Sequence, residues 1–179
     1  MKRRPIEARI ETGRREEEHD GPGVEGESFR DAMARWASGV SVVAVRDKDD
    51  GRVYATTVSA LASISARPPR IVISLGPGAQ ALPFLSEGGR FVVNILAQDQ
   101  SALASRFADA FPVGPDPFPS EGDPAIQGTH AGLTCEVERL VPVGSSRLVV
   151  GLVVETDVGG GTSPLLYHDR GYAELSDET

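Results

Sequence analysis

The strongest constraint on the fold is a series of apolar segments of strand length, each bounded by turn-forming residues. The main strand candidates are residues 40–46, 71–75, 91–96, 133–141 and 147–158. Residues 133–141 alternate apolar and polar side chains, and an Asp-Asp-Gly turn at residues 49–51 follows the first segment. Short runs with this alternation and with turn signals at their ends are typical of β-strands. The chain is therefore expected to be mainly β.

Three short helices are expected between these strands. Ser28 is the predicted N-cap of the first, which places Phe29, Met33 and Trp36 near one face and ends at a glycine. The other two are predicted over residues 79–87 and 101–107. Because the chain shows neither an internal repeat nor a regular alternation of strands and helices, the favoured architecture is a closed or nearly closed antiparallel β-barrel.

Residues 55–69, ATTVSALASISARPP, carry small hydroxyl side chains in an otherwise apolar segment. Thr57, Ser59, Ser63 and Ser65 alternate with small or apolar residues until two prolines end the pattern. This alternation predicts a half-buried strand with one small, uncharged, hydroxylated face. Such a face suits a flat polar ligand, although a Ser/Thr-rich strand edge and turn without a ligand has the same composition.

The length of 179 residues is sufficient for one domain with a substantial core. Residues 1–26 are rich in charge and poor in large apolar side chains, so they are expected to form a disordered arm. A solvated helix over residues 6–18 is the competing interpretation. The folded domain is then predicted over residues 27–179, with a long surface loop at residues 109–123 and a last structured segment at residues 164–175.

Composition excludes several classes of partner. A formal net charge of −8 argues against nucleic-acid binding, which requires a basic face. The chain also lacks an apolar run of about 18 residues, so no membrane span is predicted. The arginine-rich start is equally acidic and has no apolar segment, which is unlike a secretory signal, and a cytoplasmic location is expected.

Side chains that could carry chemistry on their own are sparse. Cys135, the only cysteine, lies in an alternating apolar segment and is predicted to be a buried, inert thiol. The three histidines lack metal-ligand spacing, so no metal site is predicted, and no motif indicates a catalytic nucleophile or acid–base pair. Any reaction is therefore expected to use a bound cofactor.

Four blocks of the chain, taken in order, resemble the short-chain flavin reductase family. They are FRDAMARWASGVSVV at residues 29–43, the segment at residues 55–69, FVVNILAQDQSALASRF at residues 91–107 and LLYHDRGYAEL at residues 165–175. Members of this family have the FMN-binding split-barrel fold and are the reductase partners of two-component flavin monooxygenases. The resemblance implies a mainly β, antiparallel split β-barrel with a few short helices.

The resemblance also implies a set of flavin-binding positions. They are Thr57, Val58, Ser59, Ala60, Ser63, Ile64, Ala79, Gln80, Phe91, Asn94 and Tyr172. Residues 74–81 would lie near the ribityl chain or the phosphate. For two positions a structural alternative stays open, because Asn94 could cap the backbone of its own turn and Tyr172 could be a core aromatic at the end of the chain.

The implied activity is hydride transfer from NADH or NADPH to flavin, with FMN as the expected cofactor and FAD as a further candidate. The expected assembly is a homodimer that supplies reduced flavin to a monooxygenase, and no side chain is assigned a catalytic role. Ser146 stands where the family has a histidine thought to assist nicotinamide binding, and residues 75–80 lack the usual Ser, Thr and Arg. An FMN-binding carrier or sensor without efficient reductase activity is therefore the alternative, followed by a barrel that holds a different cofactor or none.

Overall fold

The structure is a computed structural model that describes residues 23–159 and 163–175. Most of the predicted disordered arm, residues 1–22, lies outside the described residues. The described part contains ten strands, two α-helices and two short 3₁₀ turns. Strands of the larger sheet are β2 (Ser41–Arg46), β3 (Val53–Val58), β4 (Leu61–Ala66), β5 (Pro69–Leu75), β6 (Arg90–Ile95), β7 (Ala131–Val143) and β8 (Ser146–Val158). Remaining elements are β1 (Ser38–Gly39), β9 (Leu166–His168), β10 (Gly171–Ala173), α1 (Gly26–Ala34), α2 (Ser101–Ala108), η1 (Leu82–Phe84) and η2 (Gln98–Gln100).

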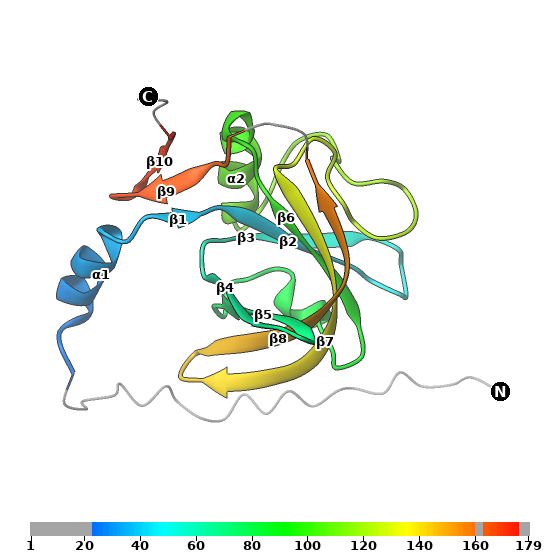
Figure 1. Ribbon diagram of the computed structural model, residues 1–179, viewed down its shortest axis with the longest axis horizontal. Helices are drawn as coiled ribbons and strands as arrows, with labels where there is room; N and C mark the ends of the chain where they lie inside the picture. The colour runs from blue at the N-terminus through cyan, green and yellow to red at the C-terminus, as the bar shows by residue number, and fades with distance from the viewer. Residues whose placement is uncertain (1–22, 160–162, 176–179) are drawn as a thin grey trace.

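The larger sheet has seven strands in the order β3-β2-β6-β7-β8-β5-β4, and every neighbouring pair is antiparallel. It curls around a central core but does not close, because β3 and β4, which are consecutive in the chain, are its two edge strands (Figure 1). The Ser74 N–H donates to the Ala60 carbonyl over 3.1 Å, which extends the pairing of β4 with β5 by one position before Leu61. The predicted antiparallel split barrel is confirmed.

The prediction of one strand across residues 55–69 is wrong. The segment forms the end of β3 and the whole of β4, separated by a break at Ser59 and Ala60. Alternation continues through both strands, so the sequence pattern does not show that the chain crosses from one edge of the sheet to the other. This break brings the two small residues to the surface, where both are exposed.

Alternate residues of the sheet face two different cores. In β2, Val43 and Val45 pack inside the barrel, whereas Val42 and Ala44 pack against α2 on the outside. Phe107 of α2 is buried in this outer core, as its helical spacing predicts. Burial on both faces explains why the predicted strand at residues 40–46 is apolar throughout rather than alternating.

Two predicted helices differ from those observed. The first begins at Gly26 rather than after Ser28, because the Phe29 N–H already donates to the Glu25 carbonyl over 3.0 Å and Ser28 falls inside the first turn. It ends at Ala34, before the predicted glycine stop. The helix expected over residues 79–87 is only the single 3₁₀ turn η1, which contains a proline in its first positions.

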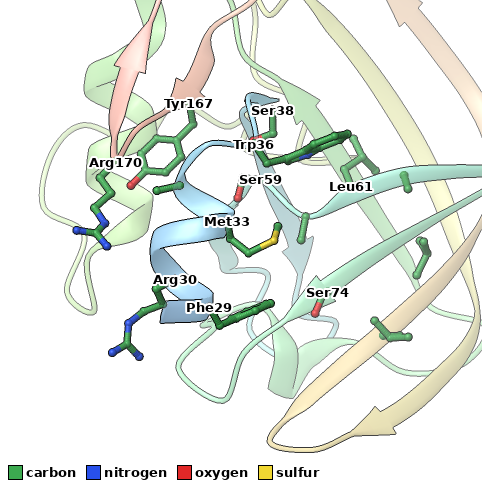
Figure 2. A pocket seen from close by; sticks show the side chains of 15 residues that line it. Phe29, Arg30, Met33, Trp36, Ser38, Ser59, Leu61, Ser74, Tyr167 and Arg170 are labelled. Atoms are coloured by element: carbon green, nitrogen blue, oxygen red, sulfur yellow. The ribbon is translucent and has the colours of Figure 1, made fainter. Parts of the chain in front are cut away.

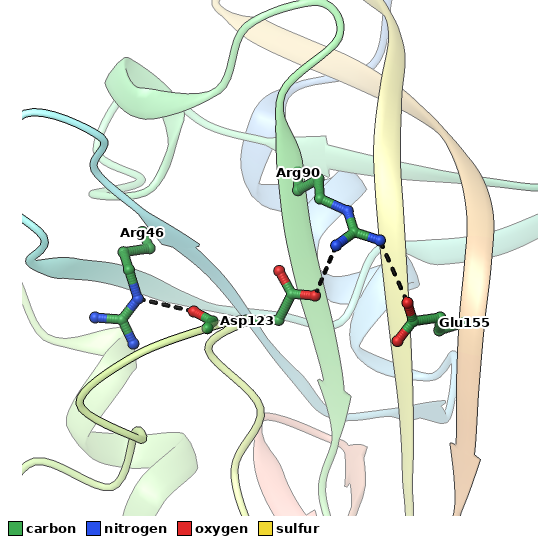
Figure 3. Close-up of polar contacts among 5 residues, drawn as sticks. Arg46, Arg90, Asp123 and Glu155 are labelled. Carbon is green, nitrogen blue, oxygen red and sulfur yellow. Dashed lines mark hydrogen bonds and ion pairs between the residues drawn. The ribbon is translucent and has the colours of Figure 1, made fainter.

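The long loop after α2 contains no helix or strand between residues 109 and 130, which agrees with the surface loop predicted at residues 109–123. Arg46 of β2 holds it by donating to the Gly122 carbonyl over 2.9 Å and to the Pro119 carbonyl over 2.5 Å. Arg90 of β6 lies between Asp123 of the loop and Glu155 of β8, at 3.2 and 3.4 Å (Figure 3). These contacts fix the loop against the outer face of the barrel.

Candidate functional site

A groove of about 760 Å³ lies between α1 and the outer face of the sheet around β4, β5 and β8 (Figure 2). Cavities that bind cofactors and small molecules typically measure about 300–1,000 Å³, so its size is appropriate for such a ligand. The residues that line it are Phe29, Arg30, Met33, Ala34, Trp36, Ser38, Ser59, Ala60, Leu61, Ala62, Val72, Ser74, Leu148, Tyr167 and Arg170. Elements far apart in the sequence therefore build one site.

The floor of the groove is made of small side chains on the outer face of the sheet. Val72 and Ser74 alternate along β5 with buried residues of the inner core, and Leu148 of β8 lies opposite Ser74. Ala60 and Ala62 continue this surface across β4. Because β4 is the last strand of its sheet, one row of its backbone N–H and C=O groups has no neighbouring strand. The floor thus combines close approach with free backbone hydrogen-bonding groups.

The opposite wall is apolar and consists of one face of α1 together with Trp36, which follows the helix. Phe29, Met33 and Trp36 are 56%, 49% and 69% exposed, and α1 has no buried residue at all. Figure 2 shows Phe29 and Met33 on the side of α1 that faces the floor, with Trp36 on the segment after the helix. Large apolar side chains left exposed in a row mark a binding surface rather than a core face.

The turn between β9 and β10 holds α1 in place. The Asp169 N–H donates to the Ala34 carbonyl at the end of α1 over 2.8 Å, and the Arg35 guanidinium lies 3.8 Å from the Asp169 carboxylate. Arg170 also donates to Asp31 of α1. Asp169 and Arg170 have positive φ angles of 49° and 65°, which form the tight turn that presents both side chains to the helix. The wall of the groove therefore depends on a contact between the two ends of the described chain.

Two of the predicted flavin-binding residues, Ser59 and Ala60, line the groove, and Ser74 of the predicted 74–81 segment joins them. Thr57 and Val58 do not. The Thr57 hydroxyl faces α2 and donates to the Ala104 carbonyl over 2.7 Å, whereas Val58 is buried inside the barrel. The strand break after Val58 is what separates the two pairs.

Phe91 and Asn94 lie in β6 and are both fully buried. Phe91 packs inside the barrel against Gly151, where an added Cβ would lie 2.7 Å from its ring. The Asn94 amide donates to the Val42 and Pro124 carbonyls over 3.2 and 3.3 Å, and its carbonyl accepts from the Ile126 N–H over 2.7 Å. The Asn94 amide therefore ties β6 to β2 and to the long loop, rather than capping the backbone of its own turn.

The remaining predicted positions do not line the groove. Ala79 is buried in the inner core, and the Gln80 amide is turned to the long loop, where it donates to the Asp109 carbonyl over 3.4 Å and to Ala110. Ser63 and Ile64 are exposed on β4 beyond the groove. Tyr172 packs edge-on against Tyr167, with ring centroids 5.9 Å apart, and Tyr167 forms the groove surface.

Sequence reasoning did not assign α1 to the site, and of the β9–β10 hairpin it named only Tyr172. The helical spacing of Phe29, Met33 and Trp36 was visible, but amphipathic spacing of this kind normally indicates a core-facing helix. Tyr167 and Arg170 belong to the C-terminal block that resembles the flavin reductases, yet nothing in the sequence indicates that this block contacts the first helix.

Among the described residues that line the groove, the titratable side chains are Tyr167, Arg30 and Arg170, so these residues include no carboxylate–imidazole pair for acid–base chemistry. Elsewhere, burial raises the pKa of the Cys135 thiol to about 12, and the residue is a free, buried cysteine as predicted. Among the described residues no three His, Cys, Asp or Glu side chains lie close enough to hold a metal ion. In residues 23–159 and 163–175, no helix has the length and apolar character needed to cross a membrane.

Known proteins share both the sequence pattern and the fold of this chain. The sequence model of the flavin reductase like domain matches residues 33–176. The chain is 37% identical over 153 residues to the reductase component of 4-hydroxyphenylacetate 3-monooxygenase from Thermus thermophilus, covering 83% of this chain and 96% of that protein. It is 31% identical to an NADH:FMN oxidoreductase from Rhodococcus qingshengii, covering 84% and 82% of the two chains.

Solved structures agree with this result. The styrene monooxygenase flavin reductase from Pseudomonas putida S12 superposes with a TM-score of 0.75 at 30% identity. The superposition covers 83% of this chain and 97% of that one. The similarity therefore extends over most of the chain.

Proposed function

Because the chain belongs to the family of flavin reductase like domains, we propose that it is an NAD(P)H-dependent flavin reductase whose groove holds the flavin. The observation that carries the proposal is the groove itself, in which an apolar helical wall faces a floor of small residues and free strand edge. Relatives named as an NADH:FMN oxidoreductase and as reductase components of monooxygenases support the same activity.

The chemistry of the groove fits a flavin ring. An isoalloxazine is flat, with apolar faces and a polar pyrimidine edge, so it needs a narrow apolar slot and hydrogen-bonding groups along one side. Met33 and Trp36 supply the apolar wall, while Ala60 and Ala62 permit close approach on the other side. The Ser59 and Ser74 hydroxyls can donate or accept, and they carry no charge that a neutral ring would have to desolvate.

A bound flavin supplies a ring that accepts a hydride from the nicotinamide. The protein's task is then to hold two flat rings in contact and to exclude water, which requires orientation rather than proton transfer by a side chain. The described residues that line the groove match this task, because apart from Arg30 and Arg170 they carry no charge, and none of them is a carboxylate or an imidazole. We therefore assign Ser59, Ala60 and Ser74 to positioning the flavin, and Trp36 and Met33 to covering it.

Several finer features belong to the proposal. FMN is the expected flavin, with FAD as the alternative, and the reduced flavin passes to a partner monooxygenase in the cytoplasm. We also propose a homodimer, supported by the exposed apolar side chains of α1 and by Ile64 of β4, which is 52% exposed. Light scattering of the purified chain tests the dimer, and a monomeric mass would refute it.

The test of the activity is steady-state NADH and NADPH oxidation with FMN, FAD or riboflavin as acceptor. Ala62→Leu adds a large side chain to the floor of the groove, and we expect it to raise the KM for flavin by about tenfold or more, as overpacking a filled site does. Ala66→Leu is the matched control, because Ala66 is exposed on the same strand but does not line the groove. A wild-type chain that oxidises neither nicotinamide with any of these flavins would overturn the reductase proposal.

The residue at position 146 favours the alternative of an FMN-binding carrier or sensor. Ser146 begins β8 two residues before Leu148, which lines the groove, so the side of the site where the family has a histidine carries no imidazole. Saturable flavin binding without nicotinamide oxidation would favour the carrier or sensor. If Ala62→Leu and Ala66→Leu change the KM for flavin equally, the groove is not the flavin site.

A further inference from the structure

The charge of the groove is opposite to that of the molecule. The chain has a formal net charge of −8, yet the two charged residues that line the groove are both arginines, Arg30 and Arg170. None of its described lining residues is acidic. A concave site lined by one sign of charge concentrates the field and attracts ligands of the opposite sign. The groove is therefore suited to a ligand with an anionic end.

The two arginines lie at one edge of the groove. Figure 2 shows both guanidinium groups on the same side of α1, away from the apolar surface formed by Met33 and Trp36. Arg30 extends back along its helix, so that a Cβ added at Gly26 would lie 3.5 Å from its Nη1 atom. Arg30 forms no ion pair within the described residues, whereas Arg170 donates to Asp31. One guanidinium is thus uncommitted, and the other shares a single carboxylate.

The loop expected near the phosphate does not supply this charge. Residues 76–80 contain no basic side chain and do not line the groove, and the Gln80 amide is occupied by the Asp109 and Ala110 carbonyls. Among the described residues that line the groove, Arg30 of α1 and Arg170 of the β9–β10 turn are the only ones with a positive charge to offer an anion. Guanidinium groups pair well with phosphate, because their N–H groups match its oxygens in pairs.

We propose that Arg30 and Arg170 bind the phosphate of the nucleotide whose ring occupies the groove. The inference rests on the proposed function, and it adds the residues that recognise the anionic end of the ligand. Two ligands carry this chemistry, namely FMN through its phosphate and NADH or NADPH through the pyrophosphate. Asp31 then competes with the ligand for Arg170.

The test compares FMN with riboflavin, which lacks the phosphate, in fluorescence titrations of the full chain. Arg30→Gln and Arg170→Gln are expected to weaken FMN binding by about threefold to tenfold, the range for exposed and charge-assisted contacts, and to leave riboflavin binding unchanged. Added salt should reduce the preference for FMN in the wild type only. Arg52→Gln is the matched control, because Arg52 is exposed on the β2–β3 hairpin and pairs with Asp50. This substitution removes the same positive charge at a position outside the groove.

Asp31→Asn separates recognition from a purely structural role. It breaks the same contact with α1 as Arg170→Gln but frees the guanidinium, so the preference for FMN over riboflavin should increase. If Arg170 only holds the helix, Asp31→Asn and Arg170→Gln will weaken both flavins alike, and the inference is overturned for Arg170.

A second arm identifies the source of the phosphate. With riboflavin as acceptor, a higher KM for NADH in both arginine variants assigns them to the dinucleotide pyrophosphate and supports the inference in that form. If neither the FMN preference nor the KM for NADH changes, the inference fails while the reductase function stands. A wild type that binds no flavin refutes the proposed function itself.

Discussion

Gly151→Ala tests the packing that sets the shape of the barrel. An ideal Cβ at Gly151 would lie 2.7 Å from Cζ and 3.1 Å from Cε1 of Phe91, and 3.2 Å from the Cβ of Cys135. Carbon atoms prefer separations of about 3.5–4.0 Å, so the overlap with the ring approaches about 1 Å. Phe91 is fully buried in the inner core and cannot turn outward. The substitution therefore forces the core to expand.

The expected cost follows from two opposing terms. Overpacking a dense core costs about 1–3 kcal/mol, and the reduced freedom of alanine in the unfolded chain returns about 0.4–1 kcal/mol. The net loss of stability should be about 1–2 kcal/mol, seen as a lower urea midpoint with an unchanged m-value. Gly132→Ala in β7 is the matched control, because its added Cβ would meet only the Asp157 Cβ at 3.8 Å. It should be neutral or slightly stabilising.

A double-mutant cycle identifies the ring as the cause. Phe91→Leu alone costs stability through the cavity it leaves, but it also removes the atoms nearest to the new methyl group. The double variant with Gly151→Ala should therefore be more stable than the sum of the single losses by about 0.5–3 kcal/mol. Additive losses, or a Gly151→Ala protein as stable as the wild type, would refute this packing.

Three further predictions follow from polar and buried groups. The Arg70 guanidinium lies 2.5 and 2.8 Å from the two Glu138 carboxylate oxygens and lowers the pKa of Glu138. Its contribution to stability should be complete above the ordinary value of 4.5 and lost as the pH falls through the lowered pKa, so acid unfolding curves of wild type and Glu138→Gln should converge at low pH. Asn94→Ala should destabilise by about 2–4 kcal/mol in thermal unfolding, because it strands the Ile126 N–H, and a smaller loss would contradict its role in tying β6 to the long loop. Cys135 should react with iodoacetamide only after denaturation, since burial raises its pKa to about 12.

The sequence predicts the barrel well because each strand can be recognised from the pattern of its own residues. The apolar residues at 91–96 and the alternation at residues 133–141 each report a strand in its own neighbourhood, and both strands are present. The break at Ser59 and Ala60 was not predictable in the same way. Alternation is the same whether two consecutive strands pair with each other or lie at opposite edges of a sheet, and here they lie at opposite edges.

The site was only partly predictable because it joins distant parts of the chain. Ser59 and Ala60 were expected from the flavin reductase resemblance, and they do line the groove. Asn94 was expected as a ligand from the same resemblance, but its amide bonds three backbone partners in the interior. Arg170 reaches α1 only through the β9–β10 turn, a contact between segments 139 residues apart that no local pattern encodes.

The most direct measurement of the central claim uses Trp36, the only tryptophan of the chain and a residue of the groove wall. Titration with FMN should quench its fluorescence in a saturable manner, beyond the inner-filter loss of a free tryptophan derivative. The same titration should fail to saturate in Ala62→Leu and should match the wild type in Ala66→Leu. Flavin binding detected by flavin fluorescence while Trp36 emission stays constant would show that the flavin binds elsewhere and would contradict the assignment of the groove.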